Sequence, residues 1–540
     1  MAAVTGSGER VPPARTDVNA VLLKGGAYRS LGEQQLSPAE LRFERGRRTA
    51  GLFVAPLAAL LMWFAPLPLD PDQQAIAAVL TGVIVLWFCE SVPIPVGGLI
   101  GVAALVLVGA APAADVLAPF GSTTVFTFIG AFILAQSMLK HGVARRVAYF
   151  VLALPGVGSS TVRIIVAFGL VTCGLSFFVS NTATVAMLVP TALGILAVIA
   201  TLMQDRGLVK PDFDPTRLRL SAALLLMLAY GAGVGGLLSP VATPPNLIGR
   251  GLIEEMTGER ISFAQWVLAA APLAASMFVV LAVVVLLVNK PEVRRIEGVA
   301  EYIAERRAEQ GPMTRAEWNT VVAFGVTVSL WLLPSVVGGI AGSESAIYEA
   351  VDSRLNEGVV AVLGASLLFV LPTNWARREA TISWSDAARI DWGTILLFGA
   401  GLVFGAMLNQ SGLAETIGQG LFATMGVSSV FAITAVSVLV ALLISETTSN
   451  TATAAVVVPI VVPLAAAAGV DPVLPALAAT FAASFSYMLP IATPQNAIVY
   501  GTGCVPILSM VRTGLVLNLL GFLLLVTILP LSAGMVGIGS

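Results

Sequence analysis

Histidine and cysteine are scarce in this chain. Its 540 residues include one histidine, His141, and three cysteines, Cys89, Cys173 and Cys504. The cysteines all lie in apolar segments and are not spaced like metal ligands, so neither a disulfide framework nor a zinc site is indicated. A lone histidine completes no Ser-His arrangement and no His-Glu zinc motif, and paired catalytic carboxylates are also missing. We therefore expect no enzymatic activity.

Charged residues are also scarce. They make up 11% of the chain, whereas hydrophobic residues make up 57%, and the mean hydropathy is +0.91. A water-soluble globular domain of this length does not have such a composition, so we predict an integral, multi-pass membrane protein surrounded by a lipid bilayer. The formal net charge of -2 leaves no basic excess for binding nucleic acid.

The N-terminal region does not resemble a signal peptide. Residues 1–50 are polar and charged, with no short apolar core followed by a small-residue cleavage site, and Arg42, Arg45, Arg47 and Arg48 precede the first apolar span. We interpret residues 1–50 as a cytoplasmic tail.

Apolar segments predict an all-α polytopic protein with about eleven transmembrane helices and two re-entrant hairpins. The hairpins are expected at 161–200 and 426–468, which are too long for one span and polar in the middle. Helices broken near mid-membrane are expected at 219–256 and 473–505, where Gly, Pro, Thr and Asn interrupt the apolar sequence. The uninterrupted spans are 51–66, 74–90, 97–112, 124–139, 264–289, 319–340, 356–372, 393–410 and 512–534.

The distribution of Lys and Arg predicts the orientation, because these residues collect in cytoplasmic loops. With the N-terminus in the cytoplasm, most of them, including Arg389, fall on the cytoplasmic side. Only Arg250, Arg260 and Arg354 fall outside. The expected location is a bacterial inner (plasma) membrane, with the C-terminus on the outer side.

The most informative feature is a duplicated polar motif. Ser-Asn-Thr-Ala-Thr occurs at 180–184 and again at 449–453, and each copy is followed by an echo, Ala-Thr-Pro-Pro-Asn at 242–246 and Ala-Thr-Pro-Gln-Asn at 492–496. The second copy starts an odd number of predicted crossings after the first, so the two halves form an inverted repeat. Paired polar breaks in two inverted halves are typical of secondary transporters.

Polar sequence at membrane depth needs a ligand, because each unsatisfied backbone group there costs several kcal/mol. Free N–H groups at a helix start favour an anion, and free C=O groups at a helix end favour Na+. No Lys or Arg lies in either motif or its immediate apolar flanks, so bound Na+ is expected to supply the positive charge. At about 5 Å and an effective dielectric near 20, Na+ and one negative charge attract by roughly 3 kcal/mol, which is a physical basis for symport.

With both motif pairs present, the chain from about 51 to 534 resembles the divalent anion/sodium symporters, which include the sodium/dicarboxylate cotransporters and the INDY proteins. The resemblance implies an elevator-type homodimer in which a transport unit moves against scaffold helices. Assigned on that basis, the parts are the N-terminal tail (1–50), scaffold helices (51–140 and 319–410), the transport unit (161–290 and 426–534) and a charged cytoplasmic connector (291–318).

The resemblance also implies the site residues. One sodium ion would bind Ser176, Ser180, Asn181 and the carbonyl of Ala242, and the other Ser445, Asn450 and the carbonyls of Thr448 and Ala492. The substrate would contact Asn181, Thr182, Thr243, Pro244, Asn450, Thr451, Thr493 and Pro494. The family often has Gly before the Thr-Pro pair, where this chain has Ala242 and Ala492, and a carbonyl ligand survives that change.

The expected function is import of di- or tricarboxylates of the succinate, malate or fumarate type by Na+ symport. Alternatives are a dicarboxylate exchanger of the same family and a transporter of sulfate or another anion. One acidic residue, Glu446, lies next to the second motif and has two interpretations, a proton-coupling carboxylate or, as the resemblance favours, a structural acid that organises the hairpin.

Overall fold

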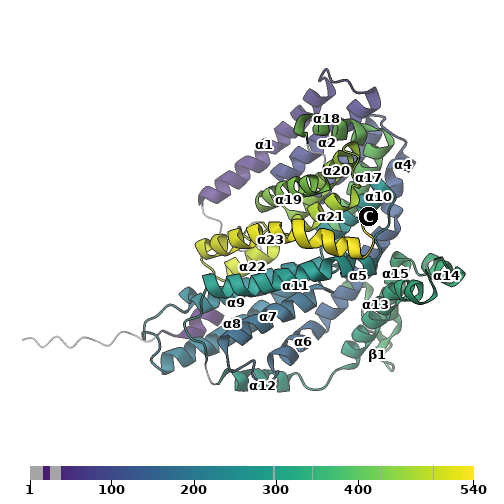
Figure 1. Ribbon diagram of the computed structural model, residues 1–540. Coiled ribbons are helices and arrows are strands. Elements are labelled where there is room, and N and C mark those ends of the chain that lie inside the picture. Colours follow the sequence, from purple (N-terminus) through teal and green to yellow (C-terminus); the bar gives the residue numbers. More distant parts are fainter. Residues whose placement is uncertain are drawn as a thin grey trace, which may run out of the picture.

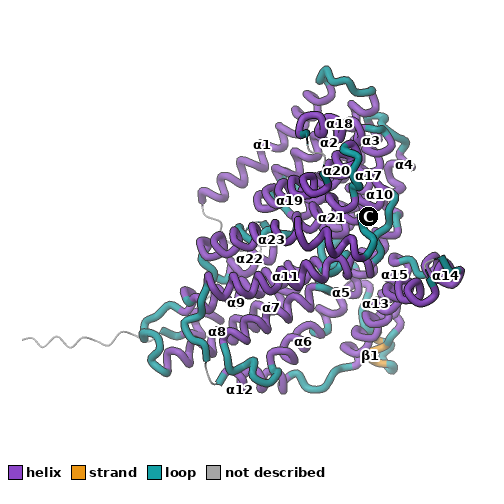
Figure 2. Tube along the Cα trace, in the orientation of Figure 1, coloured by secondary structure: helices purple, strands orange, loops and turns teal. Residues whose placement is uncertain are grey.

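The computed structural model describes residues 16–24, 38–295, 298–342, 344–426, 429–490 and 492–539. Most of this part of the chain is helical, and the strands are confined to one short hairpin (Figure 2). Residues 1–15 and 25–37 of the expected cytoplasmic tail lie outside the described residues. The predicted all-α polytopic class is confirmed.

The first half of the chain runs from the N-terminal segment to a long apolar helix (Figure 1). Its elements are η1 (Ala20–Lys24), α1 (Pro38–Trp63), α2 (Pro71–Cys89), α3 (Ile94–Leu107), α4 (Ala113–Leu117), η3 (Ala118–Gly121), α5 (Thr123–Lys140), α6 (Val143–Leu152), α7 (Thr161–Ser176), α8 (Asn181–Asp205), η4 (Pro215–Arg217), α9 (Arg219–Leu237), α10 (Pro244–Thr257) and α11 (Phe263–Val288).

The second half follows a charged helix and ends in another long apolar helix. Its elements are α12 (Val299–Glu309), α13 (Arg315–Ala341), α14 (Ala346–Arg354), α15 (Glu357–Val370), β1 (Pro372–Asn374), β2 (Glu379–Ala380), α16 (Trp384–Ala387), α17 (Trp392–Gln410), α18 (Leu413–Met425), α19 (Val430–Thr447), α20 (Asn450–Ala467), α21 (Val473–Ala482), α22 (Pro494–Gly501) and α23 (Ile507–Met535).

Ten described helices are long and apolar enough to cross a bilayer, or eleven if the bent pair α14 and α15 is one span. A helix is suited to hydrocarbon because it satisfies its own backbone hydrogen bonds. The number of candidate spans agrees with the prediction of about eleven crossings, but the helices that make up this number differ from the predicted ones. The ten include hairpin arms such as α8 and α20. Helix α3, which was predicted to cross, has only 14 residues and is not among them. Helix α1 begins at Pro38, within the expected tail. Length therefore does not separate a crossing helix from a hairpin arm.

Each Ser-Asn-Thr motif forms the tip of a helical hairpin. The first arm α7 ends at Ser176, and Ser180 caps the second arm α8 by accepting a hydrogen bond from the backbone N of Ala183 at 3.3 Å. In the second hairpin, Ser449 caps α20 in the same way, with the N of Ala452 at 3.1 Å. Serine is a favourable N-cap because its oxygen satisfies a free N–H group, so the motif itself starts a helix at both tips.

Each Thr-Pro echo likewise begins a helix after a break. Thr243 is the N-cap of α10 and Thr493 is the N-cap of α22, and a proline occupies the first turn of both helices. Proline suits this position because it has no N–H to leave unpaired and its φ is already helical. The predicted breaks in 219–256 and 473–505 are thus present.

Two asparagines at the ends of the echoes hold the broken segments in shape. Asn246 Nδ2 donates to the carbonyl oxygens of Gly236 and Ser239 at 2.8 and 2.9 Å. Asn496 Nδ2 donates to those of Ser486 and Leu489 at 2.8 and 3.2 Å. Carbonyl groups that the preceding helix leaves free are satisfied in this way, which allows irregular backbone to be buried.

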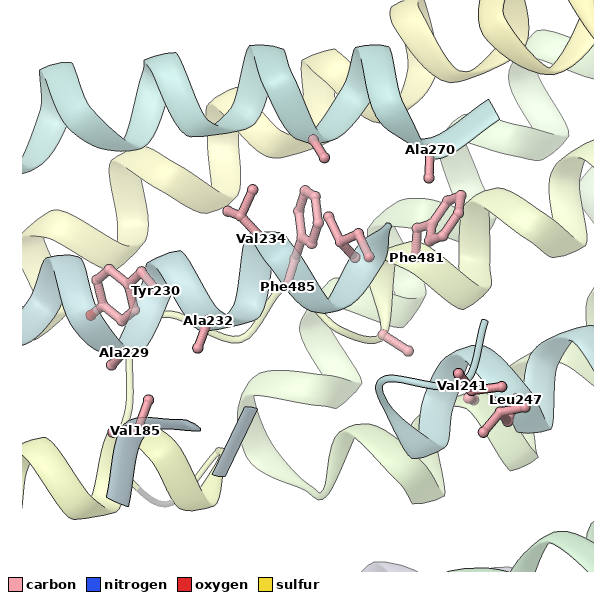
Figure 3. Close-up of a cluster of buried hydrophobic side chains, with 14 of the residues drawn as sticks. Val185, Ala229, Tyr230, Ala232, Val234, Val241, Leu247, Ala270, Phe481 and Phe485 are labelled. Atoms are coloured by element: carbon pink, nitrogen blue, oxygen red, sulfur yellow. The ribbon is translucent and has the colours of Figure 1, made fainter. Parts of the chain in front are cut away.

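The two halves exchange their broken helices. Helix α10 of the first half packs against α20 and α21 of the second, and α22 packs against α8 and α9. The long helices α11 and α23 lie side by side (Figure 1). Figure 3 shows the shared core, in which Phe481 and Phe485 join side chains of the first half such as Val234 and Ala270. Because of this exchange, elements of both halves surround the same central region.

Helix α7 of the first hairpin packs closely against α9, and a glycine on α9 allows this contact. A Cβ added at Gly235 would lie 2.1 Å from the carbonyl oxygen of Cys173, which is rigid backbone, whereas Gly174 has nothing within 4 Å. We expect Gly235→Val to separate the helices and to lower stability by about 1–3 kcal/mol. Gly174→Val is the matched control. Thermal melting in detergent would measure the effect, and equal melting temperatures for both variants would contradict this packing.

Candidate substrate site between the two hairpin tips

A cavity of about 840 Å³ lies between the two hairpin tips. Its lining comes from both tips, from the first turns of α10 and α22, from α5 and from the loop before α17. All eight residues that the sequence assigns to the substrate line it, namely Asn181, Thr182, Thr243, Pro244, Asn450, Thr451, Thr493 and Pro494. These residues come from two distant parts of the chain, and the exchange of α10 and α22 between the halves brings them together.

Four helix N-termini meet at this cavity. The N-cap residues of α8, α10, α20 and α22 are Ser180, Thr243, Ser449 and Thr493, and each of them lines it. A helix N-terminus carries the equivalent of about half a positive charge. The cavity therefore favours an anion even though the motifs contain no cationic side chain.

Two cavity-lining hydroxyl groups lack a partner. The Oγ1 of Thr243 and the Oγ of Ser484 are buried and make no hydrogen bond within the described part of the chain. The equivalent Thr493 Oγ1 instead caps its helix by accepting from the N of Asn496 at 3.3 Å. A buried hydroxyl without a partner costs free energy, so both groups are suited to contact a polar ligand.

At the first tip, two of the residues assigned to one sodium ion, Ser176 and Asn181, are in direct contact. Ser176 Oγ is buried and donates to Oδ1 of Asn181, and it is 3.5 Å from the carbonyl oxygen of Val179. Ser180 caps α8, and Ala242 lines the cavity beside Thr243. These predicted ligands are uncharged oxygens, the donor type that hard cations prefer.

The second tip repeats this arrangement with more partners. Ser445 Oγ lies 2.8 Å from Asn450 Oδ1, 2.5 Å from the carbonyl oxygen of Ala483 and 2.6 Å from Ser486 Oγ. Ser486 Oγ also donates to Asn450 Oδ1 at 2.8 Å. Ser486 was absent from the predicted ligand set, although the helix break on which it lies was recognised.

The remaining predicted sodium ligands of this half, Thr448 and Ala492, flank the second tip. Thr448 Oγ1 donates to the carbonyl oxygen of Ile444 at 2.9 Å and lies 3.2 Å from Thr453 Oγ1. Ala492 lines the cavity. Among the described residues, no group of three or more His, Cys, Asp or Glu side chains forms a metal site. The cation roles themselves stay predictions.

The buried carboxylate of Glu446 ties the second hairpin to the second break. It accepts from the backbone N atoms of Tyr487 and Met488 at 2.8 and 3.0 Å and from Asn518 Nδ2 at 2.5 Å. Tyr487 is in turn held from the other half, because its carbonyl oxygen accepts from Tyr230 Oη at 2.5 Å. These contacts favour the structural interpretation of Glu446 over the proton-coupling one.

Polar residues that were not assigned to the site from the sequence also line the cavity. They include Gln136 on α5, Arg389 and Asp391 in the loop before α17, and Thr394 in the first turn of α17. No motif or spacing marks them, since they lie outside both Ser-Asn-Thr motifs and both echoes. Arg389 had been placed only in a cytoplasmic loop.

Arg250 is a buried arginine that is paired with two carboxylates. It lies on α10 and is 4% exposed. Its Nη1 is 2.7 Å from Glu357 Oε2 on α15, and its Nε is 2.9 Å from Glu254 Oε1. Arg250 lies within the predicted broken segment 219–256, and its position on the outer side of the membrane stays a prediction. Buried charge of this kind requires such partners.

This fold and this cavity define a multi-pass membrane transporter rather than an enzyme. The sequence pattern described as the sodium:sulfate symporter transmembrane region matches residues 47–536, and the chain belongs to this family of divalent anion/sodium symporters. A sodium-dependent dicarboxylate transporter, SdcS, of Staphylococcus saprophyticus subsp. saprophyticus is 31% identical over 482 residues, 88% of this chain and 90% of that protein. SdcS of Staphylococcus aureus (strain bovine RF122) is 30% identical over 486 residues, with the same coverage.

Two solved structures share the fold. One is the YdaH transporter of Alcanivorax borkumensis, with a TM-score of 0.50 and 15% identity, covering 78% of this chain and 87% of that chain. The other is MtrF of Neisseria gonorrhoeae, described as one of a class of antimetabolite efflux pumps, with a TM-score of 0.50 and 14% identity, covering 92% of this chain and 95% of that chain. At these identities the likeness extends to the fold alone.

Proposed function

We propose that this protein imports di- or tricarboxylates of the succinate, malate or fumarate type by Na+ symport. The observation that carries the proposal is the meeting of both Ser-Asn-Thr tips and four helix N-termini at one cavity without a cationic side chain from either motif. The names of the two SdcS relatives, sodium-dependent dicarboxylate transporters, support the substrate class and the coupling ion.

In this proposal the two tips bind the substrate from opposite sides. The amide and hydroxyl groups of Asn181 and Thr182 meet one carboxylate, and those of Asn450 and Thr451 meet the other. Thr243, Pro244, Thr493 and Pro494 complete the site with the backbone of the two helix starts. Helix dipoles and hydroxyl groups bind a dianion without a fixed cationic side chain from either motif. The substrate can therefore also dissociate from the site.

Sodium supplies the charge that the motifs lack. We assign one ion to Ser176, Ser180, Asn181 and the carbonyl of Ala242, and the other to Ser445, Asn450 and the carbonyls of Thr448 and Ala492. Since Asn181 and Asn450 belong to both the ion and the substrate sets, each ion lies beside the anion. Binding of one therefore favours binding of the other, which is the coupling that symport requires.

We also propose which parts of the protein move during transport. A transport unit (161–290 and 426–534) would move as an elevator against the scaffold (51–140 and 319–410) of a homodimer, with 291–318 as a cytoplasmic connector. The protein would lie in the bacterial inner membrane with its N-terminus in the cytoplasm. The reciprocal packing of α10 on α20 and of α22 on α8 supports an inverted repeat and a single moving unit.

Uptake of labelled succinate into proteoliposomes tests the function. We expect accumulation when an inward Na+ gradient is imposed and loss of accumulation when choline or K+ replaces Na+. Equal uptake without Na+ into vesicles lacking internal substrate would contradict symport. Uptake that needs preloaded substrate but no Na+ would indicate the exchanger, and stronger competition by sulfate than by malate would indicate a sulfate carrier.

A further inference from the structure

The loop that precedes α17 contributes charged side chains to the cavity. Arg389, Ile390 and Asp391 of this loop line it together with residues of both tips. Arg389 is the one Lys or Arg among the lining residues, and it is exposed. Its side chain makes no ion pair or hydrogen bond to another described residue. A guanidinium group with free donors therefore lines the cavity that contains the predicted substrate site.

The neighbouring acidic group is already engaged. Asp391 caps α17, because its Oδ1 accepts from the N of Thr394 at 3.1 Å and its Oδ2 from Thr394 Oγ1 at 2.6 Å. The nearby Lys140 is paired as well, with Nζ 2.7 Å from Asp386 Oδ2, and it does not line this cavity. Arg389 is thus the cationic side chain in this region whose donors are available to an anion.

We propose that Arg389 binds a carboxylate of the substrate at the cytoplasmic mouth of the cavity and sets the apparent affinity for substrate on that side. This inference rests on the proposed function. The planar fork of a guanidinium matches a carboxylate through two parallel hydrogen bonds. It also attracts a dianion more strongly than a monoanion, so the preferred ligand is a fully ionised dicarboxylate.

The role is expected to act on one side of the membrane. Arg389 belongs to the predicted scaffold and not to either hairpin, so it does not travel with the tips during transport. Its contact with substrate then exists only in the conformation in which the cavity reaches the 389–391 loop. An affinity effect confined to the cytoplasmic side distinguishes this role from that of the tip residues, which contact substrate in every conformation.

Transport measured from each side tests the inference. Labelled succinate uptake, driven by Na+, would be compared in right-side-out and inside-out membrane vesicles. We expect Arg389→Gln to raise the KM about fivefold in inside-out vesicles and to leave it within about twofold in right-side-out vesicles. Arg389→Lys keeps the positive charge but loses the bidentate fork, so its KM in inside-out vesicles should lie between those of the wild type and Arg389→Gln. Adding choline chloride to 0.5 M at constant Na+ should shrink the difference, because salt screens an exposed charge.

The matched control is Arg315→Gln, which removes another exposed arginine that does not line the cavity. It should leave the KM unchanged on both sides. An unaltered KM in Arg389→Gln, an equal change on both sides, or a change confined to right-side-out vesicles would overturn the inference. Failure of the proposed function would look different, because the wild-type protein itself would then show no Na+-dependent succinate uptake.

Discussion

Asn181→Ala and Asn450→Ala should each reduce Na+-dependent uptake more than a hundredfold while leaving the protein folded. Each asparagine lines the cavity, and its Oδ1 lies against the hydroxyl group assigned to Na+, Ser176 in one half and Ser445 in the other. One substitution therefore removes a substrate contact and an ion ligand together. Hydrogen bonds to charged groups contribute about 1.5–3 kcal/mol each, so losing two costs about 3 kcal/mol or more.

The matched control is an asparagine outside the site. Asn409 lies exposed near the end of α17 and does not line the cavity, so Asn409→Ala should transport normally. Uptake would be measured in proteoliposomes at equal protein, with gel-filtration profiles to verify folding. Raising Na+ should partly restore affinity in the two site variants if ion binding is weakened. Wild-type uptake by both variants would remove these asparagines from the site.

Glu446→Gln is expected to lower stability by about 1–3 kcal/mol and transport by tenfold or more. The carboxylate accepts three N–H groups, from Tyr487, Met488 and Asn518, whereas glutamine offers one acceptor oxygen and adds two donors. All three donate to Oε1, and Met488 N also lies 3.3 Å from Oε2, so either orientation of the glutamine amide places its N–H groups against at least one of these buried donors. The break between α21 and α22, which carries Ala492 and Thr493, would no longer be held in place.

The same variant separates the two interpretations of Glu446. A structural acid predicts a lower melting temperature in detergent together with reduced Na+-dependent uptake. A proton-coupling acid instead predicts normal melting with a flattened pH dependence of transport, and that result would contradict the structural role. Glu415→Gln, on the exposed side of α18, is the control and should change neither quantity.

Local features of this fold could be predicted because their causes are local. Serine at each tip caps the next helix, and proline after each threonine starts one. Both signals depend on residues a few positions apart, so the tips and breaks were located from the chain alone. The same signals mark Asn246 and Asn496 as part of the echoes, but not which carbonyl groups they would bind.

Contacts across the molecule could not be predicted in this way. Arg389 lies far from both motifs in the sequence, and the ion pair between Arg250 on α10 and Glu357 on α15 joins two residues 107 positions apart. Crossing helices and hairpin arms such as α8 and α20 also satisfy the same criteria of length and hydropathy. Each of these features depends on which helices are neighbours.

The sequence by itself determined that this protein is polytopic and helical, and that two polar motifs interrupt its apolar helices at matching places. Hydrocarbon enforces this locally, because backbone groups there must be paired within a helix or met by something polar. The tertiary structure decided that the four helix starts share one cavity and that Arg389 borders it. Helix packing depends on the shapes of surfaces distant in the chain, such as α10 on α20, and no short pattern encodes that choice.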